Sequence, residues 1–304
     1  MKVVNAAVAH ITAWGYGFRA RRQIGTADLP APRNDVEAQR SCSPVDRGKA
    51  ACVEGQSFSA ARPDQSIATT VVPVERLELT FAPEPWSFAQ QRRADIEAHF
   101  AALRRSKPAL WNGRILMLRR HAIEGRVFHG AYLETDFASM LAWRHWGFPD
   151  PHVKNCFGMA ALRTSDGAFV LGVMAEHTAN AGWIYFPAGV PDLSDVDGSR
   201  VDLSRSIMRE LTEETGVPAA ELDPQEGWTT VLAGARVAQI RIVRAQQTAQ
   251  TLRERILAHI AQEEEPELAG IRVVRSPADL DPMMPPYVIA FLRHVWSCSP
   301  EVAW

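Results

Sequence analysis

The sequence predicts a mixed fold of the α/β (α+β) class, and three observations support that prediction. Apolar stretches of strand length interleave with segments of helical length along the chain. Hairpin-type turns separate some of the strands, so antiparallel pairs are expected within the sheet. The composition is that of a folded protein, because 46% of the 304 residues are hydrophobic and 22% are charged.

Residues 1–69 are predicted to be disordered. They are rich in Arg, Gly, Ala, Pro and Ser, and no regular apolar period runs through most of them. Such a segment cannot bury enough surface to offset the entropy lost on ordering. A signal peptide is not predicted, because residues 1–17 have no clean apolar core ahead of a small-residue cleavage site.

Residues 70–150 are predicted to form a small α/β extension. The expected elements are a strand over 71–80, a helix over 87–105, strands over 114–120 and 127–135, and a helix from the N-cap Asp136 to Trp146. The tryptophans of the last helix are expected to pack in the core, although stacking on a nucleobase is the alternative.

Residues 151–298 are predicted to form the main domain. Its expected strands cover 157–163, 168–174, 235–243 and 271–274, with an apolar run over 182–189, and its expected helices cover 202–215, 248–262 and 286–296. Ser165-Asp166-Gly167 is a hairpin turn between the first two strands. Gly216 is expected to end the helix 202–215 in the left-handed conformation.

Charge and cysteine content exclude several classes of partner. The formal net charge is −2, from 33 Lys and Arg and 35 Asp and Glu, so there is no basic surplus for nucleic acid or a membrane surface. No apolar run approaches the ~18 residues of a membrane span. The four cysteines form no CxxC pair, which argues against a disulfide scaffold and a zinc site. We therefore predict a cytoplasmic protein.

The informative segment for chemistry lies in the predicted helix 202–215. Glu210, Glu213 and Glu214 are spaced i, i+3 and i+4, which places three carboxylates on one side of the helix. Glu214 lies in line with the apolar stripe, so it is expected to point inward, where a carboxylate needs a cation or a donor. Hard oxygen ligands suit Mg²⁺, with Mn²⁺ as an alternative. A solvated, purely structural acidic face is the competing interpretation.

The run Arg209-Glu-Leu-Thr-Glu-Glu-Thr-Gly-Val217 resembles the second half of the Nudix box, GX5EX7REUXEEXGU, where U is a bulky aliphatic residue. Phe186-Pro-Ala-Gly189 resembles the Phe-Pro-Gly-Gly that leads into this box. On these residues the chain is similar to the MutT/Nudix hydrolases.

The first half of the box departs from the family pattern. Gly189 and Arg209 are 209 − 189 = 20 positions apart where the pattern has 14, so about six residues are inserted. The position of the first box glutamate is Val201, and three aspartates are candidates to replace it, namely Asp195, Asp197 and Asp202. Asp202 also suits the N-cap of the helix.

The resemblance implies an αβα sandwich around a mixed sheet, and hydrolysis of a nucleoside diphosphate linked to another moiety. A nucleotide sugar and a coenzyme A-type compound are the substrate types considered. By position, it implies metal ligands at Gly189, Glu210, Glu213 and Glu214, and catalytic roles for Arg209, Glu210 and Glu213. Mg²⁺ would neutralise the diphosphate while an activated water attacks one phosphorus.

Many members of the family take a further acid from a loop before a late strand. Residues 263–267 stand in that place, and Glu265 is our candidate for an additional metal ligand. A solvated acidic loop is the alternative. A catalytically weak nucleotide-binding or regulatory module is the second functional hypothesis, and a homodimer is left open.

Overall fold

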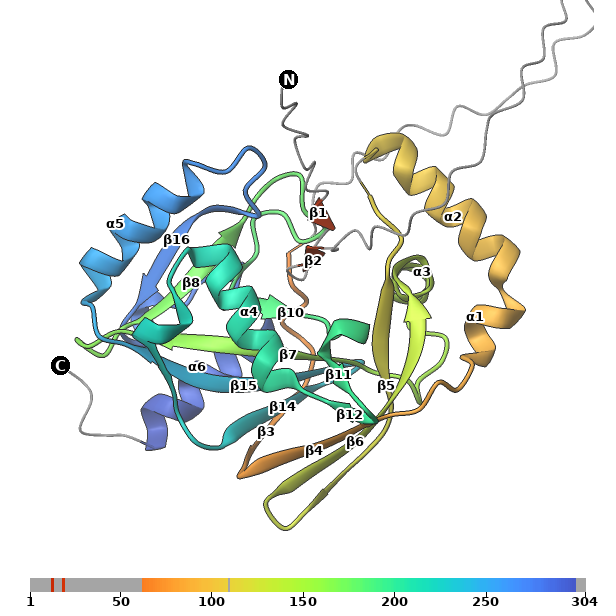
Figure 1. Cartoon of the computed structure of the whole chain (residues 1–304), viewed down its shortest axis with the longest axis horizontal. Helices are drawn as coiled ribbons and strands as arrows, with labels where there is room; N and C mark the ends of the chain where they lie inside the picture. The colour runs from red at the N-terminus through yellow and green to blue at the C-terminus, as the bar shows by residue number, and fades with distance from the viewer. Residues whose placement is uncertain (1–11, 14–17, 20–61, 109, 299–304) are drawn as a thin grey trace, which may run out of the picture. The chain divides into compact units, whose positions relative to one another are not determined.

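A computed structural model describes residues 12–13, 18–19, 62–108 and 110–298 (Figure 1). The strands are β1 Thr12–Ala13, β2 Phe18–Arg19, β3 Thr69–Val74, β4 Arg76–Phe81, β5 Arg114–Glu124, β6 Val127–Asp136, β7 Asn155–Arg163, β8 Phe169–Met174, β9 Ile184–Tyr185, β10 Ala188–Gly189, β11 Val196–Asp197, β12 Arg200–Val201, β13 Leu222–Pro224, β14 Trp228–Ala233, β15 Arg236–Ala245 and β16 Leu268–Val274. The α-helices are α1 Ser87–Gln91, α2 Arg93–Ser106, α3 Phe137–His145, α4 Leu203–Thr215, α5 Ala249–Ile260 and α6 Pro286–Cys298, and short 3₁₀ turns are η1 Leu193–Asp195, η2 Ala219–Glu221 and η3 Pro277–Asp279.

The larger sheet has the strand order β16-β8-β7-β15-β14-β3, and three short strands, β9, β10 and β13, pair beside this path. Strands β7 and β15 run parallel, while the other neighbours in this sheet are antiparallel. The mixed α/β fold class predicted from the sequence is therefore confirmed.

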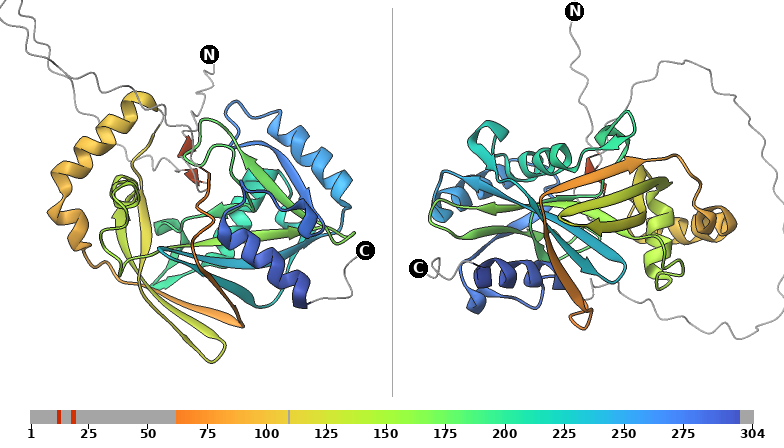
Figure 2. Two further views of the ribbon diagram at one scale, coloured as in Figure 1. Left: turned by 180° about the vertical axis from the view of Figure 1, so that it is seen from behind. Right: turned by 90° about the horizontal axis from the view of Figure 1, so that it is seen from below.

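Helices cover both faces of the larger sheet, which is why β7 is buried along nearly its whole length. Its even-numbered residues, such as Cys156 and Ala160, pack in one cluster with α4 and α5, and its odd-numbered residues, such as Phe157 and Met159, pack in another with α6. The right view of Figure 2 shows α4 and α6 on opposite sides of the sheet. This arrangement is the predicted αβα sandwich.

The smaller sheet has the order β11-β12-β4-β6-β5, with β4 and β6 parallel. The predicted strand 71–80 is divided at Glu75, so that β3 joins the larger sheet and β4 joins the smaller one. Pro73 fits this arrangement, because proline lacks a ladder donor and β3 is an edge strand paired with β14. Strand β3, from before residue 150, thus lies in the larger sheet, while β11 and β12, from after it, lie in the smaller sheet. The domain boundary at residue 150 stays a prediction.

Several elements differ from their predicted bounds. The helix expected over 87–105 is interrupted at Arg92 into α1 and α2, and β14 has no counterpart among the predicted elements. Residues 62–69 fall in the segment predicted to be disordered, yet Gln65 donates to the carbonyl of Met284. Residues 12–13 and 18–19 form the pair β1–β2, and the remainder of 1–61 lies outside the described residues. Among the described helices, none combines the length and apolarity needed to cross a membrane.

Candidate active site: an acidic cluster at Gly189

The acidic cluster is built on helix α4, whose two ends are fixed by capping residues. The Asp202 side chain accepts from the backbone N–H of Arg205 at the N-cap, and Gly216 ends the helix with a φ of 67°. Between these caps, the stripe of Leu203, Ile207 and Leu211 is fully buried against the sheet. The predicted helix, its stop at Gly216 and its inward face are confirmed.

Glu210 and Glu214 are carried inward beside that stripe, and they are only 2% and 8% exposed. The prediction that Glu214 points to the interior is therefore correct, and Glu210 is buried more deeply still. Glu213 lies further out, with 29% of its side chain exposed. The described structure thus separates two buried carboxylates from one at the rim.

Ala188 and Gly189, which precede the insertion, contact the two buried glutamates. A Cβ at Gly189 would lie 2.7 Å from both Cγ and Oε1 of Glu210, so only glycine fits there without displacing the carboxylate. The backbone N–H of Ala188 donates to Oε1 of Glu214 over 3.3 Å. Strand β10 is itself fixed by pairing with β7, where Gly189 faces Gly158. The predicted approach of Gly189 to the glutamates is therefore present.

Arg209 links the acidic helix to the insertion. Its guanidinium lies 2.6 Å from Oε1 of Glu210 and 3.7 Å from Oε2 of Glu213. On its other side, Nη2 is 3.4 Å from Oδ1 of Asp195, which is 1% exposed in the turn η1. Asp195 is therefore the candidate aspartate that contacts Arg209, while Asp197 is exposed and Asp202 caps α4. That Asp195 replaces the missing box glutamate stays a prediction.

The late acidic loop contributes a different residue from the one predicted. Glu265 is exposed, whereas Glu267, immediately before β16, is 9% exposed. The backbone carbonyl of Glu267 accepts from Ala175, and its carboxylate acts electrostatically on both Glu210 and Glu214. We correct the candidate from Glu265 to Glu267. The sequence predicts this strand over 271–274, so it does not distinguish Glu267 from Glu265, and β16 in fact begins at Leu268.

The electrostatics of the cluster favour a cation. Burial raises the pKa of Glu210 well above its usual value, Arg209 opposes this effect, and the charges of Glu214 and Glu267 add to it. Burial likewise raises the pKa of Glu214, and Glu267 is the next largest cause. The single positive charge of Arg209 thus lies among three buried carboxylates, those of Glu210, Glu214 and Glu267. A divalent ion would supply the balancing charge.

The donor set fits a hard divalent ion such as Mg²⁺ or Mn²⁺, because it consists of carboxylate oxygens beside the glycine backbone. Within the described ranges, however, no group of three or more His, Cys, Asp or Glu side chains is arranged so that it could hold a metal ion. Glu210 is instead held by Arg209. The metal roles of Gly189, Glu210, Glu213 and Glu214 remain predictions.

Two other features do not join this cluster. A cavity of about 550 Å³ lies at the start of α4, along Arg76–Thr80 and Trp228, and no residue of the acidic cluster lines it. Trp143 is 1% exposed and donates from its indole to the carbonyl of Asp150, so it packs in the core as expected.

No family model and no curated protein matches the chain. Among solved structures, 34 chains match. One is a Nudix hydrolase from M. smegmatis, RenU, at 16% identity and a TM-score of 0.32, covering 48% of this chain and 84% of that one. Another is the MutT protein from Methanosarcina mazei Go1, at 17% identity and a TM-score of 0.34, covering 49% and 96%.

Proposed function

We propose that the protein is a Mg²⁺-dependent hydrolase that cleaves the diphosphate of a nucleoside diphosphate linked to another moiety. Nucleotide sugars and coenzyme A-type compounds are the substrate classes to test first. The observation that supports this proposal is the pair of buried glutamates Glu210 and Glu214 on helix α4, whose residues resemble the Nudix box. Glu210 lies against Gly189, and the buried Glu267 acts electrostatically on both glutamates. A buried excess of hard oxygen donors suits a divalent ion and the phosphates that it binds.

Each residue has a distinct role in this proposal. Glu210, Glu214 and Glu267 would hold Mg²⁺, with Mn²⁺ as an alternative, and the backbone carbonyl of Gly189 is a further donor. When bound, the ion would neutralise charge on the diphosphate and lower the pKa of the attacking water. Arg209 orients Glu210 by their 2.6 Å contact.

The outer part of the cluster keeps this geometry in place. Asp195 holds the far side of the Arg209 guanidinium, which prevents that side chain from turning away from Glu210. The Oε2 of Glu213, which is shielded from solvent, lies 3.7 Å from Arg209 and would add negative charge near the ion. These contacts keep the carboxylates preorganised, so little reorganisation is needed when substrate binds.

The decisive experiment compares wild type with Glu214→Gln in a phosphate-release assay, using a panel of diphosphate compounds with Mg²⁺. Glutamine keeps an oxygen for the N–H of Ala188 but removes the charge. We expect cleavage of at least one compound by the wild type and a loss of roughly 10²–10³-fold in the variant. Equal rates for the two proteins would contradict the proposal.

A catalytically weak nucleotide-binding module is the second candidate, and one observation favours it. Val201 stands where the box has its first glutamate, and Glu210 is held by Arg209. In that case, calorimetry would detect nucleotide binding while no compound in the panel is cleaved. If the acidic helix is only structural, Mg²⁺ and Mn²⁺ would leave the melting temperature unchanged, because only a bound ion stabilises by mass action.

A further inference from the structure

Strand β5 forms one edge of the smaller sheet, and only its first half is covered. There, Leu116 donates to the carbonyl of Pro191, and Leu118 exchanges two backbone hydrogen bonds with Lys154. From Arg119 onward, the backbone of β5 is bonded to β6 on one side, and no other described residue pairs with it.

This open stretch, Arg120–Glu124, is also accessible, and we name it the β5 edge. Its side chains are exposed except for that of Ile123, which is half-buried. Figure 1 shows the β5–β6 hairpin projecting to the bottom of the view. A free strand edge presents backbone donors and acceptors with which another strand can pair.

The turn of the hairpin fixes which backbone groups of the β5 edge point outward. Glu124 pairs with Val127 across a two-residue turn. The closing pair of such a turn exchanges hydrogen bonds, so the N–H and C=O groups of Glu124 point to β6. This direction alternates along an antiparallel strand, so the backbone groups of His121 and Ile123 point outward. The β5 edge therefore offers two donors and two acceptors to a further strand.

Two charges of opposite sign stand on the β5 edge. Arg126 in the turn is paired with Glu75, but no ion pair joins Arg120 or Glu124 to another residue of the described ranges. Both side chains lie on the same face of the strand, because they are four positions apart. That spacing separates them by about 13 Å, so they do not pair with each other.

We propose that the β5 edge pairs with the β5 edge of a second copy of this chain, in antiparallel orientation about a twofold axis at Ala122. In this register His121 lies opposite Ile123 of the second copy, so the outward backbone groups meet in four hydrogen bonds. Arg120 lies opposite Glu124 of the second copy, once on each side of the axis. A twofold axis at any other residue of the strand would separate these charges.

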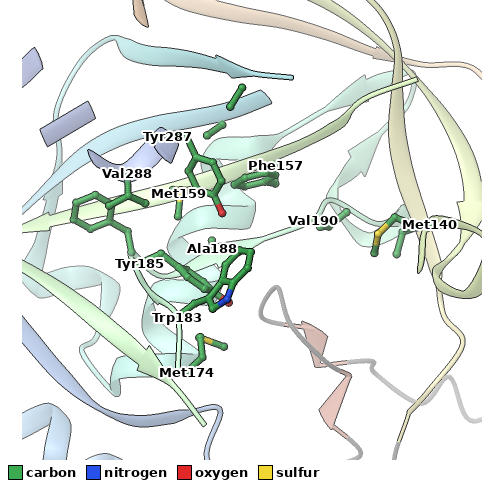
Figure 3. Close-up of a cluster of buried hydrophobic side chains, with 14 of the residues drawn as sticks. Met140, Phe157, Met159, Met174, Trp183, Tyr185, Ala188, Val190, Tyr287 and Val288 are labelled. Atoms are coloured by element: carbon green, nitrogen blue, oxygen red, sulfur yellow. The ribbon is translucent and has the colours of Figure 1, made fainter. Parts of the chain in front are cut away.

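Apolar contact does not supply this association. Among the large hydrophobic side chains that the structure describes, Leu193 is the exposed one. Others gather in the interior, as Figure 3 shows for Phe157, Trp183 and Tyr287. Four backbone hydrogen bonds and two ion pairs then supply the affinity, so we expect a dissociation constant on the order of 0.1 mM.

The test is sedimentation velocity on the full chain at low salt, over protein concentrations from about 10 µM to 1 mM. The wild type should shift from monomer to dimer. Arg120→Glu should raise the dissociation constant about tenfold or more, because it places like charges opposite each other. The double variant Arg120→Glu/Glu124→Arg should restore the dimer, because it only exchanges the partners. Arg253→Glu, the same change at an exposed arginine of α5, should leave the dimer unchanged.

A disulfide can locate the axis. In Ala122→Cys the two sulfurs face each other at the axis, so the oxidised protein should become a covalent dimer. His121→Cys is the matched control, because its two copies would lie farther apart than the ~7 Å between Cα atoms that a disulfide spans. The wild type carries the same four native cysteines and sets the background.

Three results would overturn the inference: a wild type that stays monomeric at all of these concentrations, a dimer that Arg120→Glu leaves unchanged, or crosslinking as efficient at His121 as at Ala122. Hydrogen exchange distinguishes one further occupant. Amides of the β5 edge that are protected to the same degree at every concentration would mean that the same chain covers the edge, which also overturns the inference. The proposed function is tested separately, because pairing of the β5 edge needs neither metal nor substrate.

Discussion

The acidic cluster and a cavity of about 300 Å³ lined by Arg62, Arg144 and Arg236 lie at the two ends of Trp183–Gly189. Most charged side chains are acidic in the cluster and basic in the cavity. They respond differently to burial. Burial raises the pKa of Glu210 and Glu214, so these acids can escape their repulsion by taking up protons. Arginine keeps its proton in proteins, so the charges of Arg144 and Arg236 are not removed in this way. The acidic cluster can therefore exchange protons for a cation, whereas the arginine charges of the cavity stay fixed.

The largest expected effect is on kcat, and it tests whether Glu267 belongs to the acidic cluster. Glu267→Gln should lower kcat by roughly 10²-fold, because it removes a buried carboxylate beside Glu214. Glu265→Gln is the matched control, since Glu265 is exposed two residues earlier. Steady-state kinetics on the best compound of the panel would measure both. A larger loss for Glu265→Gln would restore the original prediction and remove Glu267 from the cluster.

The next effect concerns the close contact at Gly189. Gly189→Ala places a methyl group 2.7 Å from Oε1 of Glu210, so we expect about 1–3 kcal/mol lower stability and at least a tenfold loss of kcat. Gly270→Ala is the control in β16, where an added Cβ meets no atom within 4 Å. Urea unfolding and kinetics measure the two effects. An unchanged kcat in Gly189→Ala would contradict the role of Gly189 beside Glu210.

A smaller effect is expected at the insertion. Asp195→Asn weakens the contact that holds Arg209 against Glu210, so kcat should fall about tenfold while KM changes little. Asp197→Asn, an exposed change two residues later, should behave like the wild type. If KM rose and kcat were preserved, Asp195 would act on substrate binding and not on the position of Glu210.

The smallest effect is on stability as pH changes. The fold raises the pKa of Glu214 above its usual value near 4.5, so the folded protein holds this proton more tightly than the unfolded chain does. The resulting contribution to the free energy of unfolding is complete below pH 4.5. It is lost as the pH rises through the folded-state pKa of Glu214. Without metal, the melting temperature should fall from pH 5 towards pH 8. The fall should be shallower in Glu214→Gln and largely reversed by Mg²⁺.

Thermal melts at several pH values, in EDTA and in Mg²⁺, check this prediction. Glu221→Gln is the comparison, because hydrogen bonding to Arg255 lowers the pKa of Glu221 and its stabilising effect runs in the opposite direction. A wild-type melting temperature that rises steadily to pH 8 in EDTA would remove the electrostatic basis of the acidic cluster.

Much of the cluster could be predicted because its residues are close together in the sequence. The helical period places Glu210 and Glu214 beside an apolar stripe, and Gly216 marks the end of that helix in the residues themselves. Glu267 could not be distinguished from Glu265, because the choice depends on where β16 begins and on how its carboxylate packs.

The residues alone determined the mixed α/β class, the acidic helix and its inward face, since these depend on local period and capping. Only the tertiary structure decided that Asp195 meets Arg209, that β3 and β4 enter different sheets, and that Arg144 and Arg236 share one cavity. The physical reason is distance along the chain. Contacts that join different elements, such as the one between Asp195 and Arg209 over 14 positions, leave no period in the sequence and exist only once the sheets have formed.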